Sequence, residues 1–420
     1  MDFSLILPFL VSAVGLYLLI KLRFFFISHP IKTTRDFAVA LSDRDARRSF
    51  CLALAGTLGV GNIFGVAAGI MIGGAGSLFW LFVSALLAMI IKYAETLLTF
   101  DCRVAKGGMA DVLKKTFLKT GKFLAPLYAA LTLVLSLFIG SAMQSTAVLD
   151  VAENSFLIHP ITGAFILIIL LLPCLVGGAR KIENITEIVI PVTTIIYILM
   201  CFSVILLNFS RLGDVINMII SSAFNFKSAI GGGVSLIAVR EGFARGILSN
   251  EAGAGTSAMA HSTSQRRTPH IAGLFAMSEV VFDSLILCML TGITILLSVN
   301  NTSDYKSPMS LVSAAFSNAL GSFSVYVLLL LVFAFAYSTL ICWYFYGREC
   351  ALIYFPKIKP IYPFIFVAFI VVGRFMESEF MLYITDFLLL TMTILTLSAI
   401  LRKVNRIAEI SFEGQRKNPE

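Results

Sequence analysis

Long apolar runs separated by short polar segments fill most of the chain. Eleven such runs can be drawn, over residues 3–20, 50–74, 77–100, 123–149, 160–178, 185–208, 230–260, 270–299, 322–347, 360–375 and 380–401. A helix needs about 20 apolar residues to cross the ~30 Å hydrocarbon core, and every run except the short tenth is about this long. The pattern therefore predicts an all-α polytopic membrane protein with eleven transmembrane helices and no soluble domain.

The segments between these runs differ sharply in basic charge. With the N-terminus outside, the inner segments hold 25 of the 32 Lys and Arg residues, and the outer segments hold 4, at 211, 227, 306 and 374. Basic residues concentrate in cytoplasmic loops of membrane proteins. This asymmetry predicts a multi-pass protein with the N-terminus outside and the C-terminus cytoplasmic. It also accounts for the net charge of +8 without nucleic acid as a partner.

Two segments near the ends of runs need separate interpretation. The first run begins close to Met1 and has neither a basic leader nor a small-residue cleavage site, so we expect a retained helix and no cleaved signal. In the outer loop 300–321, the stretch Ser307–Leu320 is moderately apolar. It predicts either a surface helix that caps an outer vestibule or an ordinary loop helix.

The second run is interrupted by glycines. Four of the ten residues Gly56–Gly65 are glycine, and each glycine costs a helix about 1 kcal/mol relative to alanine. Non-helical backbone survives at membrane depth only where it lines a cavity or is buried in protein. Such a break frees carbonyls for cations and N–H groups for a carboxylate, which predicts a site for a small anionic or zwitterionic solute, with or without a cation. The further spacing of Gly61, Gly65, Gly69 and Gly73 predicts a face for close helix packing.

The seventh run carries a second glycine-rich break, at Arg245–Thr256. With the first helix set aside, the two broken runs each open a set of five, and an odd number of helices makes the second set enter from the opposite side. Paired broken helices in inverted halves are typical of secondary transporters. We therefore expect four parts: 1–49 with the N-terminal helix and a cytoplasmic loop, 50–229 and 230–401 as five-helix repeats, and 402–420 as a cytoplasmic tail.

Charges within the spans are expensive and usually face a partner or a cavity. Glu241 and Arg245 are four residues apart and can pair along the helix. Glu251 either organises its turn or lies near a cation. Glu279 and Asp283 would repel each other on one helix face unless a cation or protons intervene, so Asp283 is either a coupling-ion ligand or a buried structural acid.

Other polar residues within the spans have simpler alternatives. Lys92 and Glu95 lie near the inner end of their span, where Lys92 is expected to reach the membrane surface. Ser338 and Thr339 either ligate Na⁺ or hydrogen-bond to their own helix. Gln144 carries an amide that could reach the amine or the carboxylate of a solute.

The composition limits the other function classes. The chain has 420 residues, of which 58% are hydrophobic and 13% charged, and its mean hydropathy is +0.92. Its seven cysteines form no CxxC pair and are read as core residues. Neither HExxH nor GxSxG occurs, and the four histidines lie near span ends or in loops, so we expect no enzyme. Broken helices in inverted halves favour alternating access over a continuous channel pore.

Four segments resemble the alanine/glycine:cation symporter family of sodium-coupled amino-acid carriers. Gly56–Ala67 matches its Gly-Thr-x-Gly-x-Gly-Asn-Ile-x-Gly-Val-Ala motif, and Gly74–Leu98 resembles the helix that follows it. Arg245–His261 contains the characteristic Ser-Asn-Glu-Ala-Gly-x-Gly sequence, and Phe333–Glu349 resembles an aromatic helix of the family. The resemblance implies a leucine-transporter-like fold with one added N-terminal helix, in agreement with the 1+5+5 layout.

The resemblance also implies where ligands bind. The expected substrate-binding residues share the two breaks and the helices facing them: Gly59, Gly61, Asn62, Phe64, Gln144, Leu248, Ser249, Asn250, Gly253 and Trp343. Among these, Leu248 and Trp343 would line the pocket for the side chain of the substrate. The expected Na⁺ ligands are Thr57, Asn62, Asp283, Ser338 and Thr339.

The chain departs from the family pattern at several positions. Val60 stands where threonine is usual, Phe64 where alanine is usual, and Leu248 where phenylalanine is usual, while Arg348 precedes the expected acid, Glu349. An aromatic ring gained at 64 and lost at 248 would reshape one pocket. The preference among small amino acids could therefore differ from that of the family.

These observations lead to one principal hypothesis. We expect a monomeric secondary transporter of the bacterial inner membrane that couples alanine or glycine entry to Na⁺ by alternating access. An H⁺-coupled amino-acid symporter of the same fold is the alternative, because Glu251, Glu279 and Asp283 could titrate.

Overall fold

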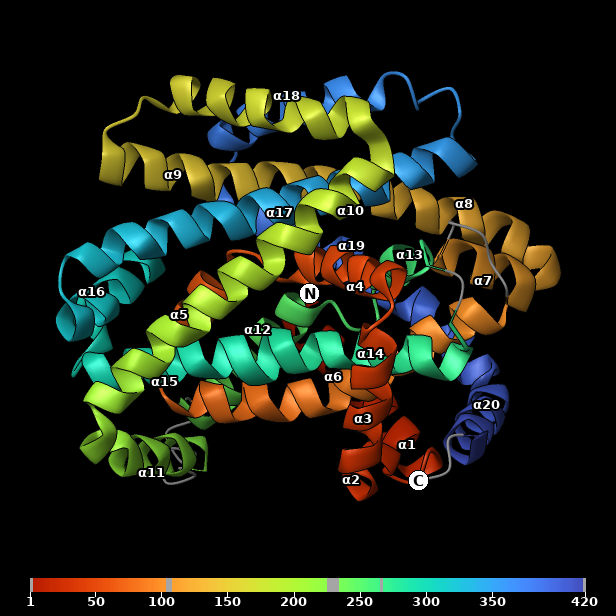
Figure 1. Cartoon of the computed structure of the whole chain (residues 1–420), viewed down its shortest axis with the longest axis horizontal. Helices are drawn as coiled ribbons and strands as arrows, with labels where there is room; N and C mark the ends of the chain where they lie inside the picture. Colours follow the sequence, from red (N-terminus) through yellow and green to blue (C-terminus); the bar gives the residue numbers. More distant parts are fainter. Residues whose placement is uncertain (1–2, 103–107, 225–233, 265–266, 418–420) are drawn as a thin grey trace.

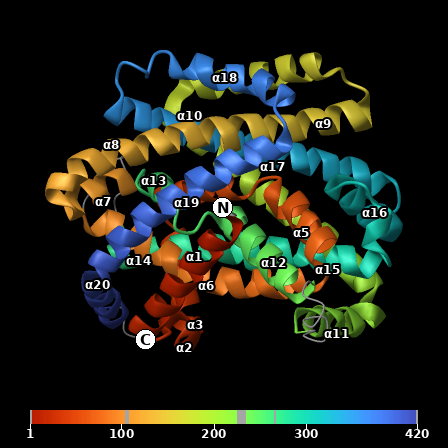
Figure 2. The same cartoon turned by 180° about the vertical axis from the view of Figure 1, so that it is seen from behind.

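The computed structural model describes residues 3–102, 108–224, 234–264 and 267–417, and this part of the chain contains helices and no strand. The start of the predicted seventh run at 230–233, the predicted repeat boundary at 229/230 and Lys227 lie outside the described residues. Figures 1 and 2 show the helices from opposite sides.

In chain order, the helices fall into three consecutive sections of the sequence. The first contains α1 (Phe3–Lys21), α2 (Phe25–Ser28), α3 (Pro30–Leu41), α4 (Arg44–Thr57), the π-helical segment η1 (Gly61–Gly65), α5 (Val66–Gly73), α6 (Gly76–Asp101) and α7 (Met109–Thr116). The second contains α8 (Leu118–Leu135), the π-helical η2 (Ser136–Met143), α9 (Gln144–Phe156), α10 (Pro160–Leu207), η3 (Phe209–Arg211), α11 (Leu212–Ala223), α12 (Val234–Asn250) and α13 (Ser257–His261). The third contains α14 (Pro269–Val280), the π-helical η5 (Val281–Cys288), α15 (Met289–Ser298), η6 (Thr302–Asp304), α16 (Pro308–Leu320), α17 (Phe323–Tyr354), α18 (Tyr362–Val372), η7 (Gly373–Phe375), α19 (Ser378–Arg402) and α20 (Val404–Lys417).

The predicted all-helical class is confirmed, whereas the count of eleven spans is not. In the described residues, six helices are long and apolar enough to cross a membrane, and a seventh is formed if the bent pair of α4 with η1 and α5 is one span. α1 and α18 are shorter apolar helices. The two runs predicted at 160–178 and 185–208 form the single 48-residue element α10, whose course is broken at Gly178, where φ is +66°.

Local sequence signals explain where several helices begin. The Asp43 carboxylate accepts a hydrogen bond from the Ala46 N–H and caps α4, and Thr268 and Pro269 open α14. Ser307 forms a reciprocal capping box with Ser310 at the start of α16. The helix expected at Ser307–Leu320 is therefore confirmed, and it contacts both η1 and α5, as a vestibule cap would.

The helices that carry the two breaks, α4 and α12, are packed against the long helices α6, α10 and α17. α6 packs along both α12 and α14, and α17 packs against α4 and α10. α7 and α20 lie at one end of the long axis of the molecule, and α11 and α16 lie at the other end (Figures 1 and 2). α7 and α20 come from segments predicted to be inside, and α11 and α16 come from segments predicted to be outside. The short helices α7, α11 and α20 occupy segments that the apolar pattern assigned to loops and the tail.

Candidate functional site

The first break separates α4 from η1 at residues 58–60, and the two parts are bent by 49°. The Gly59 N–H donates to the Thr57 carbonyl at 2.9 Å and to Asn62 Oδ1 at 3.0 Å. Thr339 Oγ1 on α17 donates to the Leu58 carbonyl at 3.1 Å. The groups that hold this turn are therefore neutral backbone, hydroxyl and amide groups.

The second break follows α12. Glu251, Gly253 and Gly255 all have positive φ, of 54°, 89° and 77°. Only glycine adopts this region without steric cost, so the two glycines fit the turn, and Glu251 is held there by its surroundings. Asn250 Oδ1 accepts a hydrogen bond from the Ala252 N–H at 3.0 Å and closes the turn.

The two breaks meet at a buried carboxylate. Asn62 Nδ2 donates to Ser249 Oγ at 3.0 Å and also contacts Asp283 Oδ1 on η5. Ser249 Oγ donates to Asp283 Oδ2 at 2.8 Å, and Ser284 Oγ donates to the same oxygen at 2.6 Å. Asp283 therefore joins the first broken helix to the second through neutral donors.

The charge of Asp283 has no basic partner within the described residues. The Asp283 side chain is completely buried, and its recorded hydrogen bonds come from an amide and two hydroxyls. A buried charge that is not balanced costs several kcal/mol. This arrangement fits both alternatives from the sequence, a structural acid and a cation ligand, because a cation or a proton would complete the charge balance. The role in Na⁺ binding stays a prediction.

Gln144 Oε1, a buried polar atom close to the first break, has no hydrogen-bond partner among the described residues, and the same is true of Trp343 Nε1 on α17. A Cβ atom built on Gly59 would lie 3.2 Å from Gln144 Oε1, so the amide faces the break directly. Buried polar atoms are rarely left unpaired in proteins. A polar ligand at this position would satisfy Gln144.

The glycine face of the first broken helix divides into two halves. Cβ atoms built on Gly69 and Gly73 would lie 3.2 Å and 3.1 Å from the side chains of Arg245 and Glu241 on α12. Cβ atoms built on Gly61 and Gly65 would meet nothing within 4 Å. Close packing, which the four-residue spacing predicted for the whole face, is therefore found only in its second half. The first half borders open space.

The hydroxyls expected to ligate Na⁺ do not form one group in the described contacts. Thr57 Oγ1 donates to the Leu54 carbonyl at 3.3 Å, and Ser338 Oγ donates to the Phe335 carbonyl at 2.8 Å, so each bonds within its own helix. Thr339 Oγ1 is the exception, because it reaches the first break as well as its own helix. Asn62 and Asp283 form a separate group.

The residues expected to surround the substrate side chain also lie in different surroundings. Trp343 is completely buried and packs against Gly140, where a Cβ would lie 2.2 Å from the Trp343 Cβ. Leu248 is half-buried and lines a cavity of about 240 Å³ between α1, α12 and α19. Phe64 is half-buried on η1, three residues after Gly61 and next to Gly65. The described contacts do not bring Leu248 and Trp343 together.

Buried charges surround the second break. Lys92 Nζ lies 3.4 Å from Glu279 Oε2 and 2.9 Å from Ser257 Oγ, and it is completely buried, so the expectation that it reaches the membrane surface is wrong. His261 Nε2 contacts the other Glu279 oxygen. Glu95 Oε2 accepts a hydrogen bond from the Gly253 N–H at 3.2 Å. Sequence reasoning missed this cluster because it did not place Lys92, Glu279 and His261 together.

These pairings also resolve two expectations about charges in the spans. Arg245 Nη2 lies 3.0 Å from Glu241 Oε2, which confirms the predicted pair along α12. Glu279 and Asp283 have different side-chain partners in the described residues. Glu279 faces Lys92 on α6, whereas Asp283 faces Asn62 on η1.

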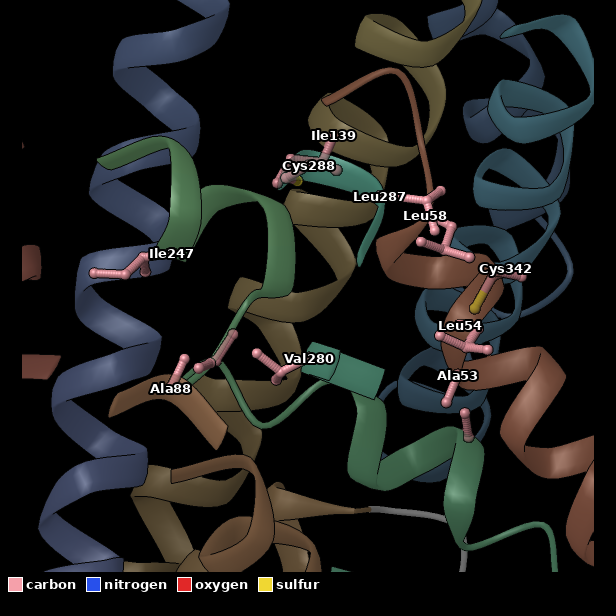
Figure 3. Close-up of a cluster of buried hydrophobic side chains, with 14 of the residues drawn as sticks. Ala53, Leu54, Leu58, Ala88, Ile139, Ile247, Val280, Leu287, Cys288 and Cys342 are labelled. Carbon is pink, nitrogen blue, oxygen red and sulfur yellow. The ribbon is translucent and has the colours of Figure 1, made fainter. Parts of the chain in front are cut away.

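Apolar side chains enclose the region between the breaks. Figure 3 shows part of this cluster of buried hydrophobic side chains, which includes Leu54 on α4, Leu58 at the first break, Leu287 and Cys288 on η5, and Cys342 on α17. All five are among the buried residues of the core. This apolar shell lowers the local dielectric, and electrostatic interactions of the enclosed polar groups become stronger.

Comparisons with known proteins agree over nearly the whole chain. The model of the sodium:alanine symporter family matches residues 2–418. The chain is 32% identical over 310 residues to the sodium/alanine symporter AgcS of Methanococcus maripaludis, covering 71% of this chain and 68% of that protein. It is 29% identical over 429 residues to the probable sodium/glutamine symporter GlnT of Bacillus subtilis, covering 99% and 89%.

The solved structures extend the likeness to the fold. The structure of the manganese transporter of Eremococcus coleocola superimposes with a TM-score of 0.54 at 15% identity, covering 84% of this chain and 76% of that chain. At this identity the likeness shows the fold alone, which is the leucine-transporter-like arrangement of helices. In the described residues, no three His, Cys, Asp or Glu side chains are grouped as ligands for a metal ion.

Proposed function

This chain belongs to the sodium:alanine symporter family, and we propose that it couples the entry of alanine or glycine to Na⁺ by alternating access. The family consists of amino-acid symporters and not of enzymes. One observation carries the proposal: Asn62 and Ser249, from the two broken helices, converge on the buried Asp283 carboxylate, which lacks a recorded basic partner. Cβ atoms built on Gly61 and Gly65, on either side of Asn62 in the sequence, would meet nothing within 4 Å.

The polar groups at the first break suit a zwitterion. The first N–H groups of a helix have no partner within the helix, and they lie at its positive end. η1 begins at Gly61, and we propose that the free N–H groups at its start bind the substrate carboxylate. The unpartnered Gln144 Oε1 can accept a hydrogen bond from the substrate amine. Both ends of an amino acid are thus recognised by groups that carry no net charge.

The coupling cation is proposed to bind at Asp283. Na⁺ prefers oxygen ligands, and this carboxylate with Ser249 and Ser284 supplies three such side chains. A cation at this position would balance the buried charge and strengthen the contact between the two broken helices. Binding of Na⁺ would then prepare the first break for the substrate.

Selection for small substrates is proposed to come from the residues around the open space. Phe64 follows Gly61 by three residues on η1, so these two positions are neighbours on the helix surface. A phenylalanine ring there would occupy volume that a larger substrate needs. One relative is named for alanine and another for glutamine, so the names of the relatives do not decide the size of the substrate. We therefore assign small substrates from the volume that the Phe64 ring occupies.

H⁺ coupling remains the second candidate because one observation favours it. Lys92 is surrounded by the completely or almost completely buried carboxyl groups of Glu95, Glu251 and Glu279, so acidic groups outnumber the lysine. Protonation of one carboxyl group would reduce this imbalance. A transporter that uses this route would respond to a pH gradient and not to Na⁺.

The orientation in the membrane and the division into repeats are also proposed. The excess of Lys and Arg in alternate loops supports a cytoplasmic C-terminus and a location in the bacterial inner membrane. Gly56–Gly65 and Arg245–Thr256 would then open the inverted repeats 50–229 and 230–401. The chain is polytopic, and the proposed functional unit is a single copy.

Uptake by purified protein in liposomes tests the proposal. Labelled alanine and glycine are supplied with an inward gradient of Na⁺, of K⁺ or of H⁺, each imposed alone. We expect accumulation only with Na⁺ and stimulation by an inside-negative potential, because a zwitterion that enters with Na⁺ carries net positive charge. Equal uptake in Na⁺-free choline medium would refute Na⁺ coupling, and uptake driven by H⁺ alone would establish the alternative.

A further inference from the structure

A cavity of about 350 Å³ lies far from the two breaks, where three apolar helices end. α1 ends at Lys21, α14 begins at Pro269 and α19 ends at Arg402. The cavity lies between the segment α2–α3 and the helix α20, which lie along the same edge of the molecule (Figures 1 and 2) and contact each other through Lys32 and Gln415. Its lining includes Arg23, Lys32, Asp36, His270, Phe412 and Arg416.

The cavity is cationic. Arg23, Lys32 and Arg416 face it together with a single acid, Asp36. Within the described residues, none of the three basic side chains forms an ion pair. Three like charges in one cavity repel each other, and an anion would relieve this repulsion.

The backbone and two contacts hold the basic groups in place. Arg23 and Phe24 have positive φ angles of 56° and 52°, and they turn the chain from α1 into α2. The Arg23 guanidinium lies 5.3 Å from the centroid of the Phe412 ring. Lys32 Nζ donates to the Gln415 carbonyl at 2.6 Å and so links α3 to the end of α20. Non-glycine residues in this conformation often accompany ligand-binding positions.

The helix beside the cavity has the character of an interfacial helix. No residue of α3 is buried. Ile31 and Val39 are 85% and 66% exposed, and they are interspersed with Lys32 and Arg35. An exposed amphipathic helix with basic residues lies at the level of lipid headgroups. Together with the three helix ends, this places the cavity at one surface of the bilayer.

We propose that this cavity binds the phosphate group of an anionic phospholipid headgroup. Arginine and lysine form charge-assisted hydrogen bonds with phosphate, and the fork of an arginine can bind two phosphate oxygens at once. Basic pockets between membrane helices bind such headgroups. A free phosphate ion has the same chemistry, but the exposed apolar residues of α3 favour the lipid. The site is separate from the breaks and does not depend on the proposed substrate or ion.

Native mass spectrometry of the purified full chain tests this proposal. The protein in neutral detergent is incubated with phosphatidylglycerol or with phosphatidylcholine, and bound lipids are counted. The pocket variant Lys32→Gln with Arg416→Gln is compared with Lys119→Gln with Lys357→Gln, which removes two exposed basic residues outside the cavity lining. Both double variants change the net charge equally, and thermal unfolding in detergent checks that each is folded.

We expect phosphatidylglycerol to bind more tightly than phosphatidylcholine. The pocket variant should lose about 25-fold in affinity for phosphatidylglycerol, from about fivefold per basic residue, while the control variant keeps the wild-type value. Equal loss in both double variants would overturn the site, because non-specific charge would then explain the binding. Inorganic phosphate is added in a separate arm. Binding of phosphate at the cavity without any preference for phosphatidylglycerol would overturn the assignment to lipid.

Discussion

The two helix breaks lie at corresponding places in the proposed repeats, yet they are stabilised by opposite means. Around Gly59 the partners are the Asn62 amide and the Thr339 hydroxyl. Around Gly253 the partners include the completely buried charges of Glu95 and Lys92. Hydrogen bonds between neutral groups contribute about 0.5–1.5 kcal/mol each, whereas breaking a buried ion pair costs about 3–5 kcal/mol.

This difference indicates that the first break binds the ligand and that the second break is a rigid support. The neutral groups that bond to the backbone of Leu58 and Gly59 can be exchanged for groups of a ligand at little cost, although Asn62 also contacts the buried Asp283 carboxylate. The second break is tied to α6 and α14 through Lys92 and Glu279, and it cannot rearrange without separating buried charges. We infer that the first break adapts to the substrate while the second break keeps its shape. The predictions below test this division.

Removal of the lysine at the second break should have the largest effect. In Lys92→Met, Glu95 loses its basic partner within a completely buried site and Glu279 keeps only its contact with His261, so we expect a loss of about 3–5 kcal/mol of stability. Thermal unfolding in detergent and the yield of folded protein measure this loss.

A double variant separates this effect from general damage to the core. Lys92→Met with Glu279→Gln removes both charges of the closest pair and should recover part of the stability. A double variant as unstable as the sum of the two single variants would show that Lys92 and Glu279 are not coupled, and the contrast between the two breaks would fail.

The carboxylate shared by both breaks should give the next largest effect. Asp283→Asn keeps the size and the hydrogen-bonding groups of the side chain but removes its charge. If the cation binds there, uptake in liposomes should fall at least about 100-fold at normal Na⁺, which corresponds to about 2.7 kcal/mol. Ser278→Ala on the preceding helix α14 is a matched control, because its hydroxyl bonds only to the Leu274 carbonyl in the described contacts. An unchanged dependence on Na⁺ in Asp283→Asn would assign this acid a structural role.

Sequence alone predicted the breaks well because glycine clusters interrupt otherwise apolar runs. The resemblance to the symporter family added Asn62 and Asn250 as expected site residues, and both form hydrogen bonds at the breaks, while their role in substrate binding stays a prediction. The contact between Asn62 and Asp283 joins residues 221 positions apart, and no local pattern encodes such a distance. The helical class was likewise evident, whereas the number of crossings was not, because α10 carries two apolar runs in one bent element.

The cluster of buried charges around Lys92 and Glu279 could not be predicted from the sequence, and the reason is physical. Lys92 lies near the end of its apolar run, where lysine usually reaches the membrane surface, and the sequence does not show which face α6 turns toward α14. Burial of Lys92 depends on Ser257 and Glu279, which come from later parts of the chain. The tail beyond 402 was treated as a loop segment, although its apolar residues Ile407 and Ile410 are buried along one face of α20.

A pair of glycine substitutions compares packed and open parts of the first break. In Gly59→Ala, the new methyl group would lie 2.9 Å from Thr339 Oγ1 and 3.2 Å from Gln144 Oε1, so we expect a loss of about 1–3 kcal/mol in stability. In Gly61→Ala the methyl group would enter open space, so thermal unfolding should change little. The KM for alanine should nevertheless rise, because the methyl group fills part of the proposed cavity. Equal unfolding temperatures of the two variants would contradict the difference in packing.

The smallest expected effect concerns the choice among substrates, and it tests whether the open half of the glycine face belongs to the binding cavity. Phe64 follows Gly61 by three residues, and a Cβ atom built on Gly61 would meet nothing within 4 Å. Removal of its ring in Phe64→Ala should therefore enlarge the cavity without disturbing the Asn62 and Asp283 contacts. A hydrophobic pocket discriminates one methylene group by only about 1–3 kcal/mol, so valine should become a competitor while glycine and alanine still compete with each other.

Competition assays against labelled alanine measure this change in wild type and in Phe64→Ala, with glycine, valine and leucine as inhibitors. Phe82→Ala, an exposed position on α6, is a matched control because it removes the same ring from the outer surface. If valine inhibits only Phe64→Ala, the ring limits substrate size and the first break adapts to its ligand, as its neutral partners indicate. The same inhibition profile in all three proteins would place Phe64 against lipid or a neighbouring helix, and size selection would then have to come from the more rigid surroundings of Trp343, which is buried against Gly140.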